Sequence, residues 1–107
     1  MTFEALEIAL DTIRQLREPL RTLTRRDRDL AKQLRRSLSS TALNLAEGWR
    51  REGADRTHLL RTAAGSAVRD SSALRVADAF GYLSLEQLQQ PLHGLDRVLA
   101  ITWRLTH

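Results

Sequence analysis

Leucine and other apolar residues recur at spacings of three and four along most of the chain, and this periodicity limits its fold more than any other feature. A period near 3.6 places such residues on one face of an amphipathic helix. One such stripe comprises Leu6, Ala9, Ile13, Leu16, Leu20 and Leu23, a second Leu30, Leu34, Leu38, Ala42, Leu45 and Trp49, and a third Leu85, Leu88, Leu92, Leu95 and Leu99. No segment alternates as a strand would, so we predict an all-α protein.

Prolines, glycines and capping residues divide the chain into four predicted helices. Their expected ranges are 3–23, 27–51, 56–80 and 85–106. Because the connections are short, successive helices should run antiparallel. We therefore predict a single domain over residues 1–107, folded as an up-down-up-down four-helix bundle.

Local signals mark the expected helix ends. Pro19 should kink the first helix or split off a short last segment. Thr24 with Asp27 resembles a start signal for the second helix, and Asp55 is suited to cap the third. Either Gly48 or Gly53 is expected to end the second helix, because glycine tolerates the left-handed backbone of a helix C-terminus.

The third and fourth helices meet at a second set of signals. Gly81 should end the third helix. Ser84 with Gln87 forms a capping-box pattern that opens the fourth. Pro91 interrupts that helix, so we expect a possible break there, with a short turn before a helix that has Pro91 in its first turn.

One face of the second helix is unusually short and uncharged for a solvent face. It carries Gln33, Ser37, Ser40, Asn44 and Glu47 opposite the leucine stripe, and the third helix matches it with Ala63, Ala64, Gly65, Ser66, Ala67, Ser71 and Ala73. Small side chains allow close helix approach. We expect Asn44 and Glu47 to fix helix register or a subunit contact, with Ser66 or an arginine as partner. Direct ligand contact is the alternative.

The scarcity of charge on these faces has a further consequence. It predicts that they are covered in a closed oligomer, with a pentamer favoured. Leu43 projects away from the leucine stripe, so it is either an exposed leucine or a subunit contact.

Basic residues gather in one part of the sequence. The chain has 17 Lys and Arg against 13 Asp and Glu, and residues 21–36 hold much of the excess. Such clusters favour phosphate-bearing partners, although a solvated arginine-rich face and pairing with Asp27 or Asp29 are alternatives. The candidate nucleic-acid-binding residues are Arg25, Arg28, Lys32, Arg35, Arg36, Arg50 and Arg51.

Aromatic residues offer a second route to nucleic acid. Trp49, beside two arginines, could stack on a base as aromatics in single-strand binders do. However, Trp49 lies in phase with the apolar stripe, and Trp103 follows Leu99 by four residues. We therefore predict that both tryptophans lie in the core or an interface.

Enzymatic and metal chemistry find little support. The chain has no cysteine, and Asp55 with His58 is a single D-x-x-H pair where a di-metal bundle needs two E-x-x-H motifs and further glutamates. No phosphate-binding glycine loop is present. We expect a non-enzymatic protein without cofactor or metal. The acidic N-terminus and the absence of a long apolar run predict no signal peptide and no membrane span, and hence a cytoplasmic protein.

Three stretches, "QLRRSLSSTALNLAEG", "AAGSA" and "ADAFGYL", resemble the four-helix-bundle family of ribosomal RNA intervening-sequence proteins. The accessory variability determinant of diversity-generating retroelements shares that fold. The resemblance covers roughly residues 30–107, and its most specific part is the S-x-x-x-N-x-A-E-G pattern from Ser40 to Gly48. The matching motif residues, which we assign to packing or assembly, are Gln33, Ser40, Asn44, Glu47, Gly48, Gly65 and Ser66.

The resemblance implies a homopentamer with a basic surface that associates with structured RNA or, in the retroelement branch, with a reverse transcriptase. Arg69 departs from the family, which usually has Glu at that position. We expect Arg69 to pair with Glu47 or Asp70 instead. The favoured function is an oligomeric RNA-associated protein. The alternatives are an accessory subunit of a reverse transcriptase and a protein-binding adaptor without nucleic acid.

Overall fold

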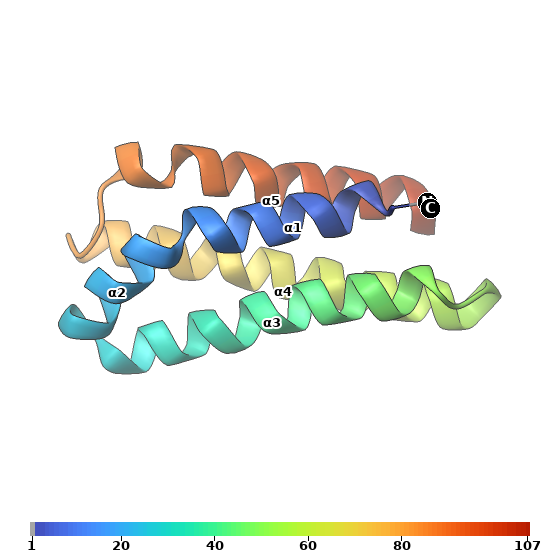
Figure 1. The fold of residues 1–107 in the computed structure, drawn as a ribbon, viewed down its shortest axis with the longest axis horizontal. Helices are drawn as coiled ribbons and strands as arrows, with labels where there is room; N and C mark the ends of the chain where they lie inside the picture. The colour runs from blue at the N-terminus through green and yellow to red at the C-terminus, as the bar shows by residue number, and fades with distance from the viewer. Residues whose placement is uncertain (1) are drawn as a thin grey trace.

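The computed structural model describes residues 2–107, and these form five α-helices without a strand (Figure 1). The helices are α1 (Glu4–Gln15), α2 (Arg17–Arg26), α3 (Arg28–Trp49), α4 (Gly53–Ala79) and α5 (Leu85–Thr106). The all-α prediction is confirmed. The prediction of four helices is corrected to five, because the segment predicted over 3–23 divides into α1 and α2, which is one of the two outcomes expected of Pro19.

Pro19 explains the division between α1 and α2. The backbone leaves helical geometry at Leu16, with φ −92° and ψ 2°. Pro19 is the third residue of α2. It has no N–H to donate to the carbonyl four residues earlier, and its ring crowds that carbonyl. Leu16, Pro19 and Leu20 are all buried, so the chain turns without exposing its apolar stripe.

The long helices run antiparallel and surround one core (Figure 1). α3 packs chiefly on α4, α4 on α5, and α5 on α1, while α2 continues along α3. The molecule measures 42 × 22 × 22 Å. Leucines from α2 to α5 and from the α1–α2 junction fill the core, including Leu16, Leu23, Leu34, Leu45, Leu60, Leu74, Leu88 and Leu95. The start of α1, the α3–α4 connection and the end of α5 lie at one end of the bundle.

Several predicted helix ends are corrected. Asp27, not Thr24, caps α3, because its Oδ1 accepts a hydrogen bond from the Leu30 backbone N–H at 3.0 Å. Asp55 lies inside the first turn of α4, which begins at Gly53 after Glu52. Gly48 is helical, whereas Gly53 adopts φ 59° and so turns the chain between α3 and α4.

The predicted signals around α5 are partly confirmed. Gly81 has φ 78° just after α4, and Ser84 and Gln87 form the expected capping box. Pro91 does not break the helix. It is the seventh residue of a continuous α5 and is buried, so its ring packs in the interior while only one backbone hydrogen bond is lost.

Two helical glycines allow close contacts between helices. A Cβ on Gly48 would lie 3.0 Å from Leu60 Cδ2 and 3.1 Å from Leu59 Cβ, so α3 approaches α4 closely there. A Cβ on Gly94 would overlap Thr12 Oγ1, which brings α5 close to α1. Both glycines therefore serve packing.

Candidate nucleic-acid interface

Five of the predicted basic residues lie together where α2 meets α3. They form the α2–α3 cluster, which consists of Arg25, Arg28, Lys32, Arg35 and Arg36, and all five are exposed. Four of them follow one face of α3, because positions spaced by three, four, seven and eight residues share a helix face. The fifth, Arg25, lies at the end of α2, three residues before α3 begins.

The carboxylates inside this segment do not neutralise the cluster. Asp27 caps α3, and Asp29 Oδ2 accepts a hydrogen bond from Gln33 at 3.5 Å. Within residues 2–107 the ion pairs involve Arg14, Arg21, Arg51 and Arg97. The predicted pairing of cluster residues with Asp27 or Asp29 does not occur, and the cluster presents uncompensated positive charge.

Arg50 and Arg51 lie apart from the cluster. They follow the far end of α3, about 21 Å beyond Arg36 at a rise of about 1.5 Å per residue. Arg51 pairs with Glu47 at 3.4 Å. The seven predicted residues therefore form two separate basic regions, because a straight helix of this length divides them.

Trp49 is unsuited to stacking on a base. Its indole stacks on the Phe3 ring, with centroids 4.3 Å apart, and the Arg56 guanidinium carbon lies 4.8 Å from the indole centroid. Arg56 also donates to the carbonyls of Trp49 (2.7 Å) and Arg51 (2.9 Å). Trp49 is half-buried against the core, in agreement with the predicted packing role.

Trp103 differs from Trp49. Its side chain is 62% exposed and stacks on His107. The prediction that Trp103 lies in the core is wrong, because this position near the end of α5 faces solvent. Leu43 is likewise exposed at 67%, and burial of either residue in a subunit contact stays a prediction.

A seam of short polar side chains joins α3 to α4. Ser37 Oγ donates to the Ser66 carbonyl at 2.9 Å, and the hydroxyls of Ser40 and Ser66 share a hydrogen bond of 2.8 Å. Asn44 Nδ2 donates to the carbonyl and hydroxyl oxygens of Ser40 at 2.9 and 3.2 Å. Asn44 thus supports the contact with Ser66 through Ser40, while its own hydrogen bonds stay within α3.

Other motif residues lie at the edges of this seam. Gln33 and Glu47 are exposed, and Gly65 is exposed with open space where a Cβ would lie. Arg69 is exposed and pairs with neither Glu47 nor Asp70, contrary to the prediction. Glu47 lies on the opposite half of α3 and pairs with Arg51, while Asp70 turns into the core.

Asp70, which the sequence suggested only as a partner of Arg69, is a buried polar residue of the α3–α4 contact. It is fully buried on α4, and its Oδ2 accepts a hydrogen bond from Thr41 Oγ1 at 2.7 Å. Its Oδ1 has no partner among the described residues. Burial raises the pKa of Asp70 from its usual 3.8, while the hydroxyls of Ser37 and Thr41 oppose this shift.

The Thr41 hydroxyl has one proton but two neighbours. Its oxygen lies 3.0 Å from the Ser37 carbonyl and 2.7 Å from Asp70 Oδ2. A neutral Asp70 can donate to Thr41 while Thr41 donates to Ser37, so protonation satisfies both contacts. The available sequence signal was position on a helix face, since Asp70 follows Ser66 by four residues and Thr41 follows Ser37 by four, which places each on the seam side of its helix.

Above the seam lies an open groove of about 550 Å³, which we call the α3–α4 groove. Its lining residues are Gln33, Arg36, Ser37, Ser40, Thr62, Gly65, Ser66 and Arg69. Small residues form its floor, and Arg36 and Arg69 stand on opposite helices. Motif and basic residues therefore meet in one place.

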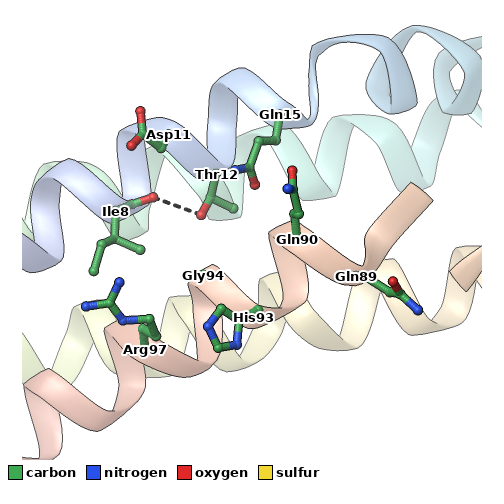
Figure 2. A pocket seen from close by; sticks show the side chains of 9 residues that line it. All are labelled: Ile8, Asp11, Thr12, Gln15, Gln89, Gln90, His93, Gly94 and Arg97. Atoms are coloured by element: carbon green, nitrogen blue, oxygen red, sulfur yellow. Dashed lines mark hydrogen bonds between the residues drawn. The ribbon is translucent and has the colours of Figure 1, made fainter. Parts of the chain in front are cut away.

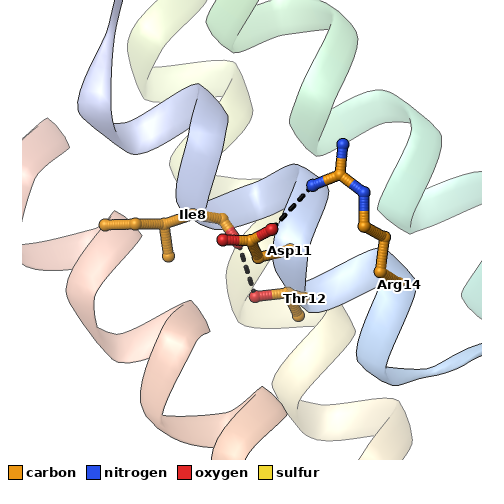
Figure 3. Close-up of polar contacts among 4 residues, drawn as sticks. All are labelled: Ile8, Asp11, Thr12 and Arg14. Carbon is orange, nitrogen blue, oxygen red and sulfur yellow. Dashed lines mark hydrogen bonds and ion pairs between the residues drawn. The ribbon is translucent and has the colours of Figure 1, made fainter.

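A second hollow, of about 380 Å³, lies between α1 and α5 (Figure 2). Unlike Arg36 and Arg69, the charged side chains at this hollow form ion pairs. Asp11 binds Arg14 on α1 at 2.6 Å, while Thr12 Oγ1 donates to the Ile8 carbonyl at 2.8 Å (Figure 3). Arg97 pairs with Glu4 at 2.5 Å. This hollow therefore carries balanced charge.

Two further features bear on chemistry and location. Among residues 2–107 no group of three or more His, Asp or Glu side chains is arranged to hold a metal ion. No helix in this part of the chain is long and apolar enough to cross a membrane.

Comparison with known proteins gives one family and one fold. The model of the 23S rRNA-intervening sequence protein family matches residues 3–103. A protein of unknown function from the S23 ribosomal protein family of Bacteroides thetaiotaomicron has a similar crystal structure, with a TM-score of 0.82 and 18% identity over 95% of this chain and 97% of that chain. No curated protein matches significantly.

Proposed function

This chain belongs to the family of 23S rRNA-intervening sequence proteins, and from that premise we propose that it is a non-enzymatic oligomeric protein that binds structured RNA in the cytoplasm. The observation that supports RNA binding is the α2–α3 cluster, whose exposed cations have no carboxylate partner among the described residues. Four of its five members are arginines, which can engage phosphate oxygens bidentately.

Binding of this kind would follow the RNA backbone. An A-form duplex exposes phosphates and 2′-hydroxyls, and its deep major groove hides the base edges. A helix face with spaced cations suits phosphate contacts, which position a protein without reading sequence. We therefore expect a preference for RNA shape over RNA sequence.

Assembly is part of the same proposal. Leu43, Val68 and Trp103 are each more than half exposed, and such side chains support a contact with further copies of the chain. We propose a closed ring, with a pentamer favoured by the family resemblance. Several copies of the cluster on one particle would strengthen RNA binding through multivalency.

A second candidate is a protein-binding role. The same exposed apolar side chains would suit a different protein, either as an adaptor contact or as an accessory surface for a reverse transcriptase. In that role the cluster would affect solubility rather than binding.

Salt-dependent RNA binding separates the two candidates. A structured RNA is titrated by filter binding from about 50 to 200 mM salt, with each phosphate contact expected to contribute roughly 0.7–0.9 to the slope of log affinity against log salt. The triple variant Arg28→Gln, Lys32→Gln and Arg35→Gln should reduce that slope by about 2–3.

The matched control also removes three cations, at Arg75, Arg97 and Arg104, which lie on α4 and α5 outside the cluster. It should leave the slope nearly unchanged. Absence of RNA binding at about 50 mM salt, or equal slopes for the two triple variants, would reject the RNA proposal and favour the protein-binding role.

Light scattering tests the assembly. The expected mass is about five times the 12.2 kDa of one chain. A stable monomer at micromolar concentration would contradict the ring.

A further inference from the structure

We infer that the α3–α4 groove is a binding site for a phosphate group. The groove is open to solvent, and its floor consists of the hydroxyls of Ser37, Ser40 and Ser66 with Gly65. A guanidinium stands on each side, Arg36 from α3 and Arg69 from α4. This arrangement offers charge, donors and space together.

Arg36 and Arg69 make no polar contact that would stabilise the fold. Both are exposed, and neither forms an ion pair or a side-chain hydrogen bond within residues 2–107. No carboxylate lines the groove. Two like charges facing one hollow repel each other, and an anion between them would remove that repulsion.

The nearest acidic groups do not supply this anion. Asp29 accepts a hydrogen bond from Gln33 at the outer end of the groove. Asp70 is buried beneath α4, where it accepts from Thr41, and burial favours its neutral form. Arg36 and Arg69 are therefore both available to an anion from outside the chain.

The α1–α5 hollow provides an internal comparison. It is also an open hollow between two helices (Figure 2), but its Arg97 is bound by Glu4. Its Asp11 is bound by Arg14 (Figure 3). Paired charges of this sort are ordinary on protein surfaces. Only the α3–α4 groove, of these two hollows, combines uncompensated arginines with free hydroxyl capacity.

The groove also has the donors and the room that a phosphate requires. Each guanidinium can give a bidentate contact to phosphate oxygens. The hydroxyls of Ser40 and Ser66 share one hydrogen bond, which leaves one hydroxyl proton and further lone pairs available. Gly65 has no atom within 4 Å of its ideal Cβ position, so nothing fills the space above it.

The phosphate can belong to an RNA strand or to a small phosphorylated molecule. As an RNA contact the inference rests on the proposed function. It then adds one localised phosphate, about one helix turn beyond Lys32, to the diffuse contacts of the α2–α3 cluster. As a small-molecule site it stands independently.

Two variants test the groove, and each acts differently. Arg69→Gln removes one guanidinium. Gly65→Leu fills the space without changing charge, and it should not unfold the protein because it raises helix propensity at an open position. Arg75→Gln is the matched control, since Arg75 is an exposed α4 arginine outside the groove. Melting temperatures verify folding of all variants.

The first probe is inorganic phosphate, followed by NMR titration of backbone amides at physiological pH. We expect phosphate to perturb the amides around Ser66 in the unaltered protein and in Arg75→Gln. Affinity should fall at least tenfold in Arg69→Gln and in Gly65→Leu. Identical binding by all four proteins, or no binding by the unaltered protein, would overturn the inference.

The second probe is the structured RNA, which identifies the source of the phosphate. If the phosphate belongs to RNA, Gly65→Leu should weaken RNA binding and Arg69→Gln should lower the salt slope by about 0.7–0.9, whereas Arg75→Gln should change neither. If phosphate binds as expected while RNA does not bind any form, the groove is a small-phosphate site and the proposed function fails. If RNA binds all forms equally and phosphate binds none, the proposed function stands and the groove inference is rejected.

Discussion

The α3–α4 and α1–α5 contacts solve the same packing problem with different chemistry. Each brings two antiparallel helices together beside a glycine, Gly48 in one and Gly94 in the other. The α3–α4 contact adds a hydroxyl seam and the buried Asp70, and uncompensated arginines stand above it. The α1–α5 contact has one threonine bound to its own helix and charges in pairs.

The difference separates features that stabilise the fold from features that face a partner. Exposed ion pairs contribute little to stability, and the α1–α5 hollow has the balanced surface expected of a bundle. A buried carboxyl costs stability unless it is hydrogen-bonded, and the exposed arginines above it form no ion pair that would stabilise the fold. The α3–α4 contact therefore contains polar groups that the stability of the fold does not explain, and it is the better candidate for function.

The largest expected effect is loss of the Thr41 hydroxyl. Thr41→Val removes the hydroxyl that is hydrogen-bonded to Asp70 while keeping the shape of the side chain. Leaving a buried polar group unsatisfied costs about 1–3 kcal/mol, and more for a charged one. We expect chemical denaturation at pH 7 to show a loss in this range.

The matched control is Thr62→Val on α4. Thr62 is exposed, and its hydroxyl donates only to the His58 carbonyl within its own helix at 3.0 Å. Thr62→Val should therefore lower the free energy of unfolding only slightly. Equal losses for the two variants would show that the Thr41–Asp70 contact does not stabilise the interface.

The next effect is a pH dependence that Asp70 imposes on stability. Because the pKa of Asp70 is raised in the folded state, the folded protein holds this proton to higher pH than the unfolded chain. The contribution of Asp70 to stability is therefore greatest below its usual pKa of 3.8 and declines as pH rises through the raised value.

Asp70→Asn removes this dependence because an amide does not titrate. Unfolding free energies of both proteins, measured from about pH 4 to pH 8, should show the unaltered protein losing stability relative to Asp70→Asn as pH rises. A constant difference across this range would mean that the pKa of Asp70 is the same in both states.

The sequence predicted much of the first contact but not its most constrained residue. The short polar face of α3 and the small residues of α4 were correctly predicted to meet, because periodicity places them on facing sides. The burial of Asp70 was not predicted because a lone carboxylate in an arginine- and serine-rich stretch resembles a surface residue. Burial depends on the rotation of α4 about its axis, which the weak periodicity of that helix does not fix.

The second contact was predicted less well. Pro19 marked the end of α1, yet Pro91 lies inside α5 with the same local signal. The difference is tertiary, since Pro91 is buried in the bundle after a capped first turn. The closeness of Gly94 to Thr12 involves residues far apart in sequence, and no local pattern specifies it.

A smaller effect is expected from closing the α1–α5 approach. In Gly94→Ala the new Cβ overlaps Thr12 Oγ1. Overpacking of about 2 kcal/mol should be partly offset by about 1 kcal/mol of helix propensity, for a net loss of about 1 kcal/mol. Thermal and chemical denaturation measure this directly.

Two further variants, Thr12→Ala and Gly65→Ala, test whether the effect of Gly94→Ala comes from the overlap with Thr12. In a Thr12→Ala background the nearest other atom to the new Cβ is Ile8 Cγ2 at 3.6 Å, so Gly94→Ala should become stabilising. Gly65→Ala, at an open helical position, should stabilise the unaltered protein by about 1 kcal/mol. Equal effects at Gly94 and Gly65 would contradict the close α1–α5 contact.

The smallest effect is expected at Asn44, and it tests whether the seam acts within one chain or between chains. Its amide bonds only to Ser40 of the same helix, and the Ser40–Ser66 hydrogen bond can form without it. In a single chain Asn44→Leu should therefore cost about 0.5 kcal/mol, the low end for a hydrogen bond that leaves no partner buried and unpaired. Arg75→Ala, an exposed change on α4, supplies the reference.

If Asn44 also contacts a neighbouring subunit, the variant should lose oligomer mass by light scattering at a concentration where Arg75→Ala keeps it. A melting temperature and a mass both equal to those of Arg75→Ala would exclude Asn44 from packing and from assembly alike.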